Sequence, residues 1–203
     1  MSIVLYHCKD ARSLRVLWTL EEMGLPYQLH ALPFPPRVLQ RDYLEVNPLG
    51  TVPYMIDGDV RMSESSGICH YLVERYGPTP LAIASSDRQY GTYLNWLYFS
   101  DATLTFPQTI YLRYSMLEPE ERRLPQAADD YKRWFAGRLR AVETATADRE
   151  YLCAGRFTIA DVCIAYALYL ARNIGLGECL GPNASGYLDR LRARPAFARA
   201  ASR

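Results

Sequence analysis

The first 31 residues carry the pattern that most constrains the fold: a strand, a helix and a second strand in close succession. Ile3 to Tyr6 is a short apolar run with β-branched residues, which favours a strand. Arg12 to Met23 has apolar residues at helical spacing, and Gly24 follows where helices commonly end. Tyr27 to Ala31 is a second strand pattern. A helix of about a dozen residues between two strands is typical of a right-handed parallel βαβ unit, so the chain begins as an α/β domain.

A hairpin and a helix are predicted next. Asp57-Gly58 is a strong tight-turn dipeptide, and it separates the strand patterns of Val52 to Ile56 and Val60 to Met62. Ser63 to Tyr76 has apolar residues at helical spacing and ends at Gly77-Pro78. The N-terminal part is therefore a βαβ unit followed by a hairpin and a helix.

The composition changes after residue 78. Gly77 to Ser86 holds two prolines, a glycine and small side chains, which is typical of a linker, and the rest of the chain has helical patterns throughout. We therefore expect an α/β domain over 1–78, a linker over 79–87 and an all-helical domain over 88–203. Within that half, Thr158-Ile159-Ala160-Asp161 fits a capping box at the start of a helix. We interpret Asp161 as structural.

Charge and cysteine usage exclude several classes of function. The 23 basic and 22 acidic residues leave a net charge of +1, without the basic excess of a nucleic-acid-binding protein. The five cysteines are scattered and form no C-x-x-C pair, which argues against a zinc site or a disulfide framework. No apolar run approaches the roughly 18 residues of a membrane span, and the N-terminus lacks the pattern of a signal peptide. We expect a cytoplasmic protein with no metal, nucleic-acid or membrane partner.

Two short motifs in the first domain suggest a ligand with a peptide backbone and an amino-acid head. Pro53 at the start of a strand cannot donate to a β-ladder, so the backbone of Val52 could pair with an extended peptide; an ordinary edge strand is the alternative. Glu64 and Ser65 open a helix, whose N-terminus favours a carboxylate. Ser65 could bind that carboxylate while Glu64 pairs with an ammonium group. Plain N-capping by Ser63 is the alternative.

In this order, the motifs resemble those of the cytosolic glutathione transferases, and of bacterial members in particular. The resemblance spans nearly the whole chain and rests on four segments: Arg15-Val16-Leu17-Trp18, the loop from Asn47 to Pro53, Glu64-Ser65, and Phe157 to Asp161. It implies an α/β thioredoxin-like N-terminal domain that binds glutathione, followed by an all-α C-terminal bundle. It also implies a detoxification enzyme, commonly a homodimer, that uses reduced glutathione as co-substrate and conjugates it to a small hydrophobic electrophile.

The resemblance assigns roles to individual residues. Pro53 would be cis, the Val52 backbone would pair with the cysteinyl part of glutathione, and Glu64 with Ser65 would hold the γ-glutamyl head. The helical half would supply the electrophile pocket, for which the aromatic candidates are Tyr98, Phe106 and Tyr111. Each of these three could equally belong to the core or to an interface.

The catalytic group departs from the family pattern. Catalysis requires a donor or a positive charge that favours the glutathione thiolate. The position of the usual serine holds Asp10, and that of the bacterial cysteine holds Arg12. We favour Ser13 as the donor, with Arg12 assisting by charge. The open alternatives nearby are Tyr6 and Cys8.

Two other functions compete with conjugation. A glutathione-dependent thiol reductase would use Cys8 through a mixed disulfide. A scaffold could keep the glutathione site but lack thiol activation, as the residues at positions 10 and 12 suggest. Replacing Cys8 by serine distinguishes the reductase from the conjugating enzyme, because only the reductase needs the thiol.

Overall fold

The computed structural model describes residues 3–203 and divides into two compact units. The sheet unit runs to Ala82 and also includes Arg192–Arg203, whereas the helical unit is Ile83–Leu191. Residues 77–89, around the expected linker, contain neither helix nor strand. The C-terminal segment departs from the expected division, in which all of residues 88–203 formed one domain.

A four-stranded mixed sheet forms the first unit. Its strands are β1 (Ile3–His7), β2 (Tyr27–Ala31), β3 (Tyr54–Asp57) and β4 (Val60–Met62), in the order β2-β1-β3-β4. β1 and β2 are parallel, while β3 is antiparallel to both of its neighbours. The predicted βαβ unit and hairpin are thus confirmed, and the arrangement is the thioredoxin-like α/β fold.

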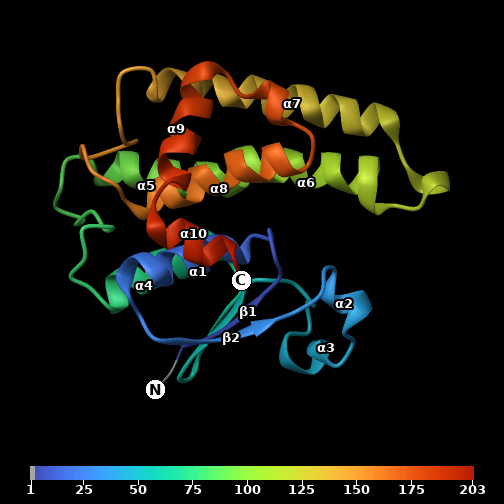
Figure 1. The fold of residues 1–203 in the computed structure, drawn as a ribbon, viewed down its shortest axis with the longest axis horizontal. Helices are drawn as coiled ribbons and strands as arrows, with labels where there is room; N and C mark the ends of the chain where they lie inside the picture. The colour runs from blue at the N-terminus through green and yellow to red at the C-terminus, as the bar shows by residue number, and fades with distance from the viewer. Residues whose placement is uncertain (1–2) are drawn as a thin grey trace. The chain divides into compact units, whose positions relative to one another are not determined.

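Helices α1 (Ser13–Met23), α4 (Ser65–Arg75) and α10 (Pro195–Ala201) lie together on one face of the sheet (Figure 1). Every side chain of α1 from Ser13 to Leu20 is buried, because this helix packs against β1, α4 and α10. It ends at Gly24, whose φ of 63° lies in the left-handed region and whose N–H donates to the carbonyl of Leu20. The C-cap glycine expected from the sequence is confirmed.

The other face of the sheet carries aromatic residues. Side chains alternate along β1, so Tyr6 points away from the face on which Leu5 and His7 are buried. The Tyr6 ring stacks on His30 of β2 at 4.8 Å, and its centroid lies 5.3 Å from that of Tyr43. Tyr43 begins the short helix α3 (Tyr43–Val46), which follows the equally short α2 (Pro36–Leu39).

The C-terminal segment joins the sheet unit through α1. The Phe197 ring meets Trp18 edge-on, with centroids 4.9 Å apart and an interplanar angle of 78°. Arg194 Nε lies 2.6 Å from Glu22 Oε1, and Arg199 Nε lies 2.6 Å from Glu21 Oε2. Arg194 and Arg199 therefore hold the C-terminal segment to α1 by ion pairs.

The second unit is built from helices alone, as predicted. One long run contains α5 (Tyr90–Phe99), a π-helical segment η1 (Ser100–Thr105), α6 (Phe106–Leu112) and a second π-helical segment η2 (Arg113–Leu117). The remaining elements are η3 (Glu120–Arg122), α7 (Pro125–Ala145), α8 (Ile159–Asn173), η4 (Gly177–Cys179) and α9 (Pro182–Arg192). α8 is buried along most of its length, as its nearly continuous apolar sequence predicts.

The predicted capping box begins α8. The Thr158 N–H donates to Asp161 Oδ2 at 2.8 Å, and the box is complete in both directions. The carboxylate is fully buried and also accepts from the Leu152 N–H at 2.9 Å and the Tyr187 hydroxyl at 2.8 Å. Burial raises the pKa of Asp161, and these hydrogen bonds oppose that shift. Asp161 is therefore a structural residue, as we interpreted it.

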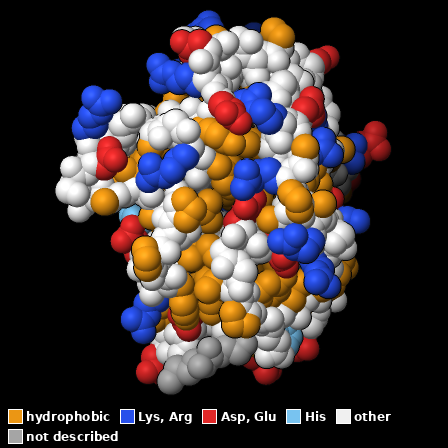
Figure 2. All heavy atoms as spheres, turned by 60° about the vertical axis from the view of Figure 1, so that its left-hand side comes forward, with side chains coloured by type: hydrophobic (Ala, Val, Ile, Leu, Met, Phe, Trp, Pro, Cys, Tyr) orange, Lys and Arg blue, Asp and Glu red, His pale blue; other side chains and the backbone are white. Residues whose placement is uncertain are grey.

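Three features of the structure bear on possible partners. No helix among residues 3–203 has both the length and the hydropathy needed to cross a bilayer. Over the same residues, no three His, Cys, Asp or Glu side chains are grouped so that they could hold a metal ion. On the face drawn in Figure 2, basic and acidic side chains are interspersed.

Candidate functional site

The candidate site lies at the carboxyl end of β1. Tyr6 of β1 pairs with Tyr54 of β3 in an antiparallel register. The residues that precede β3, Val52 and Pro53, therefore lie beside the residues that follow β1, beginning with Cys8. The loop after Cys8 leads into α1, so β1, β3 and α1 all contribute to this end of the sheet unit.

The loop before β3 is held rigidly. The buried Asn47 donates from Nδ2 to the Thr51 carbonyl at 2.9 Å, and the Tyr43 hydroxyl donates to the same carbonyl at 2.8 Å. Gly50 has a φ of 58°, and a Cβ there would stand 2.6 Å from Arg37 Cβ, so only glycine fits. This loop fixes the approach to the Val52–Pro53 bond.

Val52 offers backbone groups that the fold itself does not use. The Val52–Pro53 peptide bond is cis, as the family resemblance implies, and Val52 is partly exposed. Among residues 3–203 neither the N–H nor the carbonyl of Val52 has a hydrogen-bond partner. Because such groups are normally paired in folded proteins, an extended ligand could bind here as an added strand.

The N-terminus of α4 supplies the second part of the site. Glu64 is its N-cap residue and is exposed, whereas Ser65 keeps only 2% of its surface. The Ser65 hydroxyl accepts a hydrogen bond of 2.9 Å from Nη1 of Arg15, a residue of α1 with no exposed surface. Sequence reasoning missed Arg15 as a site residue. Its signal was a charged residue between Leu14 and Val16, on a helix face that is otherwise apolar.

Ser13, our first choice for the catalytic donor, is fully buried. Its hydroxyl lies 2.8 Å from Nδ1 of His7 and accepts from the Cys8 N–H at 3.3 Å. Burial lowers the pKa of His7 to about 4, against a smaller opposing effect of the nearby Asp10 carboxylate. Ser13 thus connects β1 to α1, and its position does not favour direct contact with a ligand.

The two alternative donors are poorly placed. Cys8 has 1% of its surface exposed, its Sγ lies 3.6 Å from the Pro33 carbonyl, and burial raises the pKa of its thiol to about 11. At neutral pH such a thiol is almost entirely protonated and a weak nucleophile. Tyr6 faces the aromatic layer on the other side of the sheet. Arg12, partly exposed at the N-cap of α1, is the candidate cation that remains at this end.

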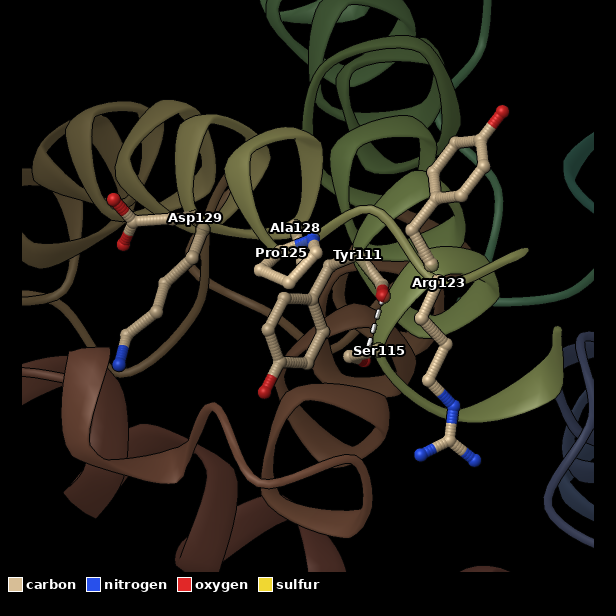
Figure 3. Close-up of a pocket in the computed structure, with 8 residues that line it drawn as sticks. Tyr111, Ser115, Arg123, Pro125, Ala128 and Asp129 are labelled. Atoms are coloured by element: carbon tan, nitrogen blue, oxygen red, sulfur yellow. Dashed lines mark hydrogen bonds between the residues drawn. The ribbon is translucent and has the colours of Figure 1, made fainter. Parts of the chain in front are cut away.

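The three aromatic candidates in the helical unit differ in their exposure and in their contacts. Tyr98 is 54% exposed and Phe106 is 46% exposed. Phe106 meets the edge of Tyr131 at 6.0 Å, and Tyr131 stacks on the exposed Trp134 at 5.5 Å. Tyr111 lines a pocket of about 310 Å³, together with Tyr114, Ser115, Arg123, Pro125, Ala128, Asp129 and Lys132 (Figure 3).

Fold and site together define a protein with a thioredoxin-like unit, whose Val52 backbone groups have no partner among residues 3–203, and with a helical unit. A family model described as the N-terminal domain of glutathione S-transferase matches residues 5–80. The glutathione S-transferase GstB of Escherichia coli K12 is 30% identical over 186 residues, which cover 90% of this chain and 88% of GstB. The chain belongs to the glutathione S-transferase family.

Solved structures agree with this assignment. A glutathione transferase from Methylococcus capsulatus superposes with a TM-score of 0.85 at 25% identity, covering 98% of this chain and 97% of its own. The glutathione transferase URE2P6 from Phanerochaete chrysosporium, solved with oxidized glutathione, gives 0.83 at 27% identity, with 98% and 94% covered. The thioredoxin-like domain and the helical domain that we predicted are both present in this fold.

Proposed function

We propose that the protein is a glutathione transferase that conjugates reduced glutathione to a small hydrophobic electrophile. The observation that carries the proposal is the backbone of Val52, which has no hydrogen-bond partner in the described part of the chain and lies in the unit where the N-terminus of α4 presents Ser65. The family membership supports it. Because conjugation makes an apolar electrophile water-soluble, we place the activity in detoxification.

Each part of glutathione has a complementary group in the sheet unit. The cysteinyl main chain would pair with the N–H and carbonyl of Val52, as in strand addition. The γ-glutamyl carboxylate would bind the Ser65 hydroxyl at the start of α4, where the helix dipole favours a negative charge. The exposed carboxylate of Glu64 would pair with the γ-glutamyl ammonium.

We propose that Arg12 activates the thiol by charge, together with the positive N-terminus of α1. The thiol releases its proton to solvent, and the thiolate sulfur then forms a bond to the electrophilic carbon while the leaving group departs with its electron pair. Arg12→Ala should raise the pKa of the bound thiol by about one pH unit, measured from the ultraviolet absorbance of the thiolate. If Ser13→Ala causes that change and Arg12→Ala does not, Ser13 is the activating residue, as the sequence first suggested.

Calorimetric titration with reduced glutathione tests the site. We expect a dissociation constant in the micromolar to low-millimolar range that weakens about tenfold in Ser65→Ala, because a hydrogen bond to a charged group is lost. Ser115→Ala, in the helical unit, is the matched control and should leave the affinity unchanged. Absence of binding in the wild-type protein would rule out the proposed function.

A conjugation assay with an activated aryl halide separates enzyme from scaffold. Turnover that depends on glutathione supports the enzyme, whereas binding without turnover identifies a scaffold. Cys8→Ser should keep both binding and turnover, because the buried thiol takes no part. Loss of a thiol-reductase activity in Cys8→Ser would instead support the reductase.

We further propose a cytoplasmic homodimer. All five cysteines lie within residues 3–203 and are free thiols, which suits a reducing compartment. In the helical unit, Phe106, Tyr131 and Trp134 form an aromatic cluster, of which Phe106 and Trp134 are about half exposed. Such a surface is typical of an interface. Sedimentation of the wild-type protein should give the mass of two chains, and Trp134→Glu should give that of one.

A further inference from the structure

The helix α1 carries a buried cation whose role the proposed function does not explain. Arg15 has no exposed surface, although the burial of a guanidinium is costly unless its N–H groups are paired. One of those groups, Nη1–H, donates to the Ser65 hydroxyl at 2.9 Å. The fold thus places the guanidinium group of Arg15 within hydrogen-bond distance of the first residue of α4.

This contact determines how Ser65 can bind a ligand. A serine hydroxyl has one proton to donate and two lone pairs that accept. Arg15 occupies a lone pair, and among residues 3–203 no group accepts the Ser65 proton. The hydroxyl is therefore left as a donor at the start of α4, where the helix dipole favours a negative charge. Because Ser65 is 98% buried, a carboxylate that binds it is weakly screened by water.

We propose that Arg15 is a positioning residue for the γ-glutamyl carboxylate of glutathione: it holds the Ser65 hydroxyl as a donor and adds its charge behind the N-terminus of α4. This inference rests on the proposed function and deepens it. It predicts that the contribution of Arg15 depends on the ligand carboxylate, and that Arg15 has no direct role in the reaction at sulfur.

The geometry also requires arginine at this position. The planar guanidinium directs several N–H groups at fixed angles, whereas a lysine ammonium is a compact charge on a flexible chain. Arg15→Lys keeps the positive charge and changes the direction of the donor. Arg15→Met removes both the positive charge and the hydrogen-bond donors, while the side chain fills a similar volume.

The test compares two ligands by calorimetry: reduced glutathione, and an analogue in which hydrogen replaces the γ-glutamyl carboxylate. We expect Arg15→Lys to weaken glutathione binding about tenfold and Arg15→Met about thirtyfold, with the affinity for the analogue unchanged in both. In the conjugation assay, KM for glutathione should rise by the same factors while kcat at saturation stays constant. Arg75→Lys, on the exposed last turn of α4, is the matched control and should change neither affinity.

A double-mutant cycle with Ser65 keeps the proposal testable if Arg15→Met does not fold. In the Ser65→Ala background, Arg15→Lys should weaken glutathione binding less than twofold, because the hydroxyl that it orients is gone. Equal losses for glutathione and the analogue, or full additivity with Ser65→Ala, would overturn the role of Arg15 alone. If the wild-type protein binds neither ligand, the proposed function and this inference both fail.

Discussion

The burial of His7 makes the stability of the fold depend on pH. Neutral His7 is buried with its Nδ1 2.8 Å from the Ser13 hydroxyl, and its pKa falls from 6.5 to about 4. The unfolded chain therefore takes up a proton near pH 6.5, which the folded chain does not accept until about pH 4. Stability from this group is complete above pH 6.5 and decreases as the pH falls toward 4.

We expect the free energy of unfolding to drop by about 2 kcal/mol between pH 7.5 and pH 5 because of His7 alone. Urea denaturation at the two pH values, for the wild type and His7→Asn, measures this term. The asparagine cannot be protonated, and its amide oxygen can accept from Ser13. An equal pH dependence in both proteins would show that His7 is not responsible.

The thiol of Cys8 should react slowly with alkylating reagents. Its pKa of about 11 and its 1% exposure leave little thiolate at neutral pH. In contrast, Cys179 is partly exposed. With a limiting amount of iodoacetamide at pH 7.5, peptide mass mapping should find Cys179 modified and Cys8 unmodified. Faster modification of Cys8 would reopen the reductase hypothesis.

For single residues, the sequence predicts a role where that role depends on neighbours close in the chain. The cis proline loop and the helix start at Glu64 and Ser65 are short motifs, so pattern alone located them. Arg15 and Ser65 are 50 residues apart, and their contact depends on how α1 packs on α4. The sequence did not show that Ser13 is buried. Its hydroxyl contacts His7 at the end of β1 and the N–H of Cys8 in the loop that follows.

At the scale of elements, the start of α8 depends on one carboxylate. Asp161 Oδ1 and Oδ2 accept from the Leu152 and Thr158 N–H groups and from the Tyr187 hydroxyl. Asp161→Ala leaves these buried donors unpaired, so it should lower the free energy of unfolding by about 4 kcal/mol.

Chemical denaturation of Asp161→Ala beside Asp148→Ala measures this cost. The Asp148 side chain is 79% exposed, so its replacement should change stability by less than about 0.5 kcal/mol. Similar small effects in both variants would mean that the capping box contributes little to the fold.

The sequence predicts a helix or strand well where the periodicity of its apolar residues and the residues that mark its ends indicate the same bounds. The bounds of β2 and the end of α1 at Gly24 match the sequence pattern. The two π-helical segments η1 and η2 were not predicted, because each keeps helical composition while changing the hydrogen-bond register by one residue. Apolar periodicity does not distinguish such a change from a continuous helix.

At the scale of the whole molecule, the C-terminal segment shows where sequence reasoning ends. Its helical pattern and its place in the chain assigned it to the all-helical domain expected over 88–203. Its partner is instead α1, at the other end of the sequence, through Phe197 and Trp18. Partner choice is a tertiary property that local patterns do not encode.

The packing of the C-terminal segment on α1 stabilises the helix that carries Arg15 and Ser13. Phe197 is 5% exposed against Trp18, so Phe197→Ala removes a large buried contact and should lower the free energy of unfolding by about 3 kcal/mol. Arg199→Ala removes only the ion pair of a half-exposed arginine with Glu21, and should cost less than about 1 kcal/mol.

Hydrogen exchange read by mass spectrometry locates the effect along the chain. In Phe197→Ala, peptides from α1 should lose protection while those from α8 in the helical unit keep theirs, because α10 packs on α1. Looser α1 packing also loosens the contact of Arg15 with Ser65, so glutathione affinity should fall together with α1 protection. If α1 stays protected in Phe197→Ala, the C-terminal segment does not brace the glutathione site.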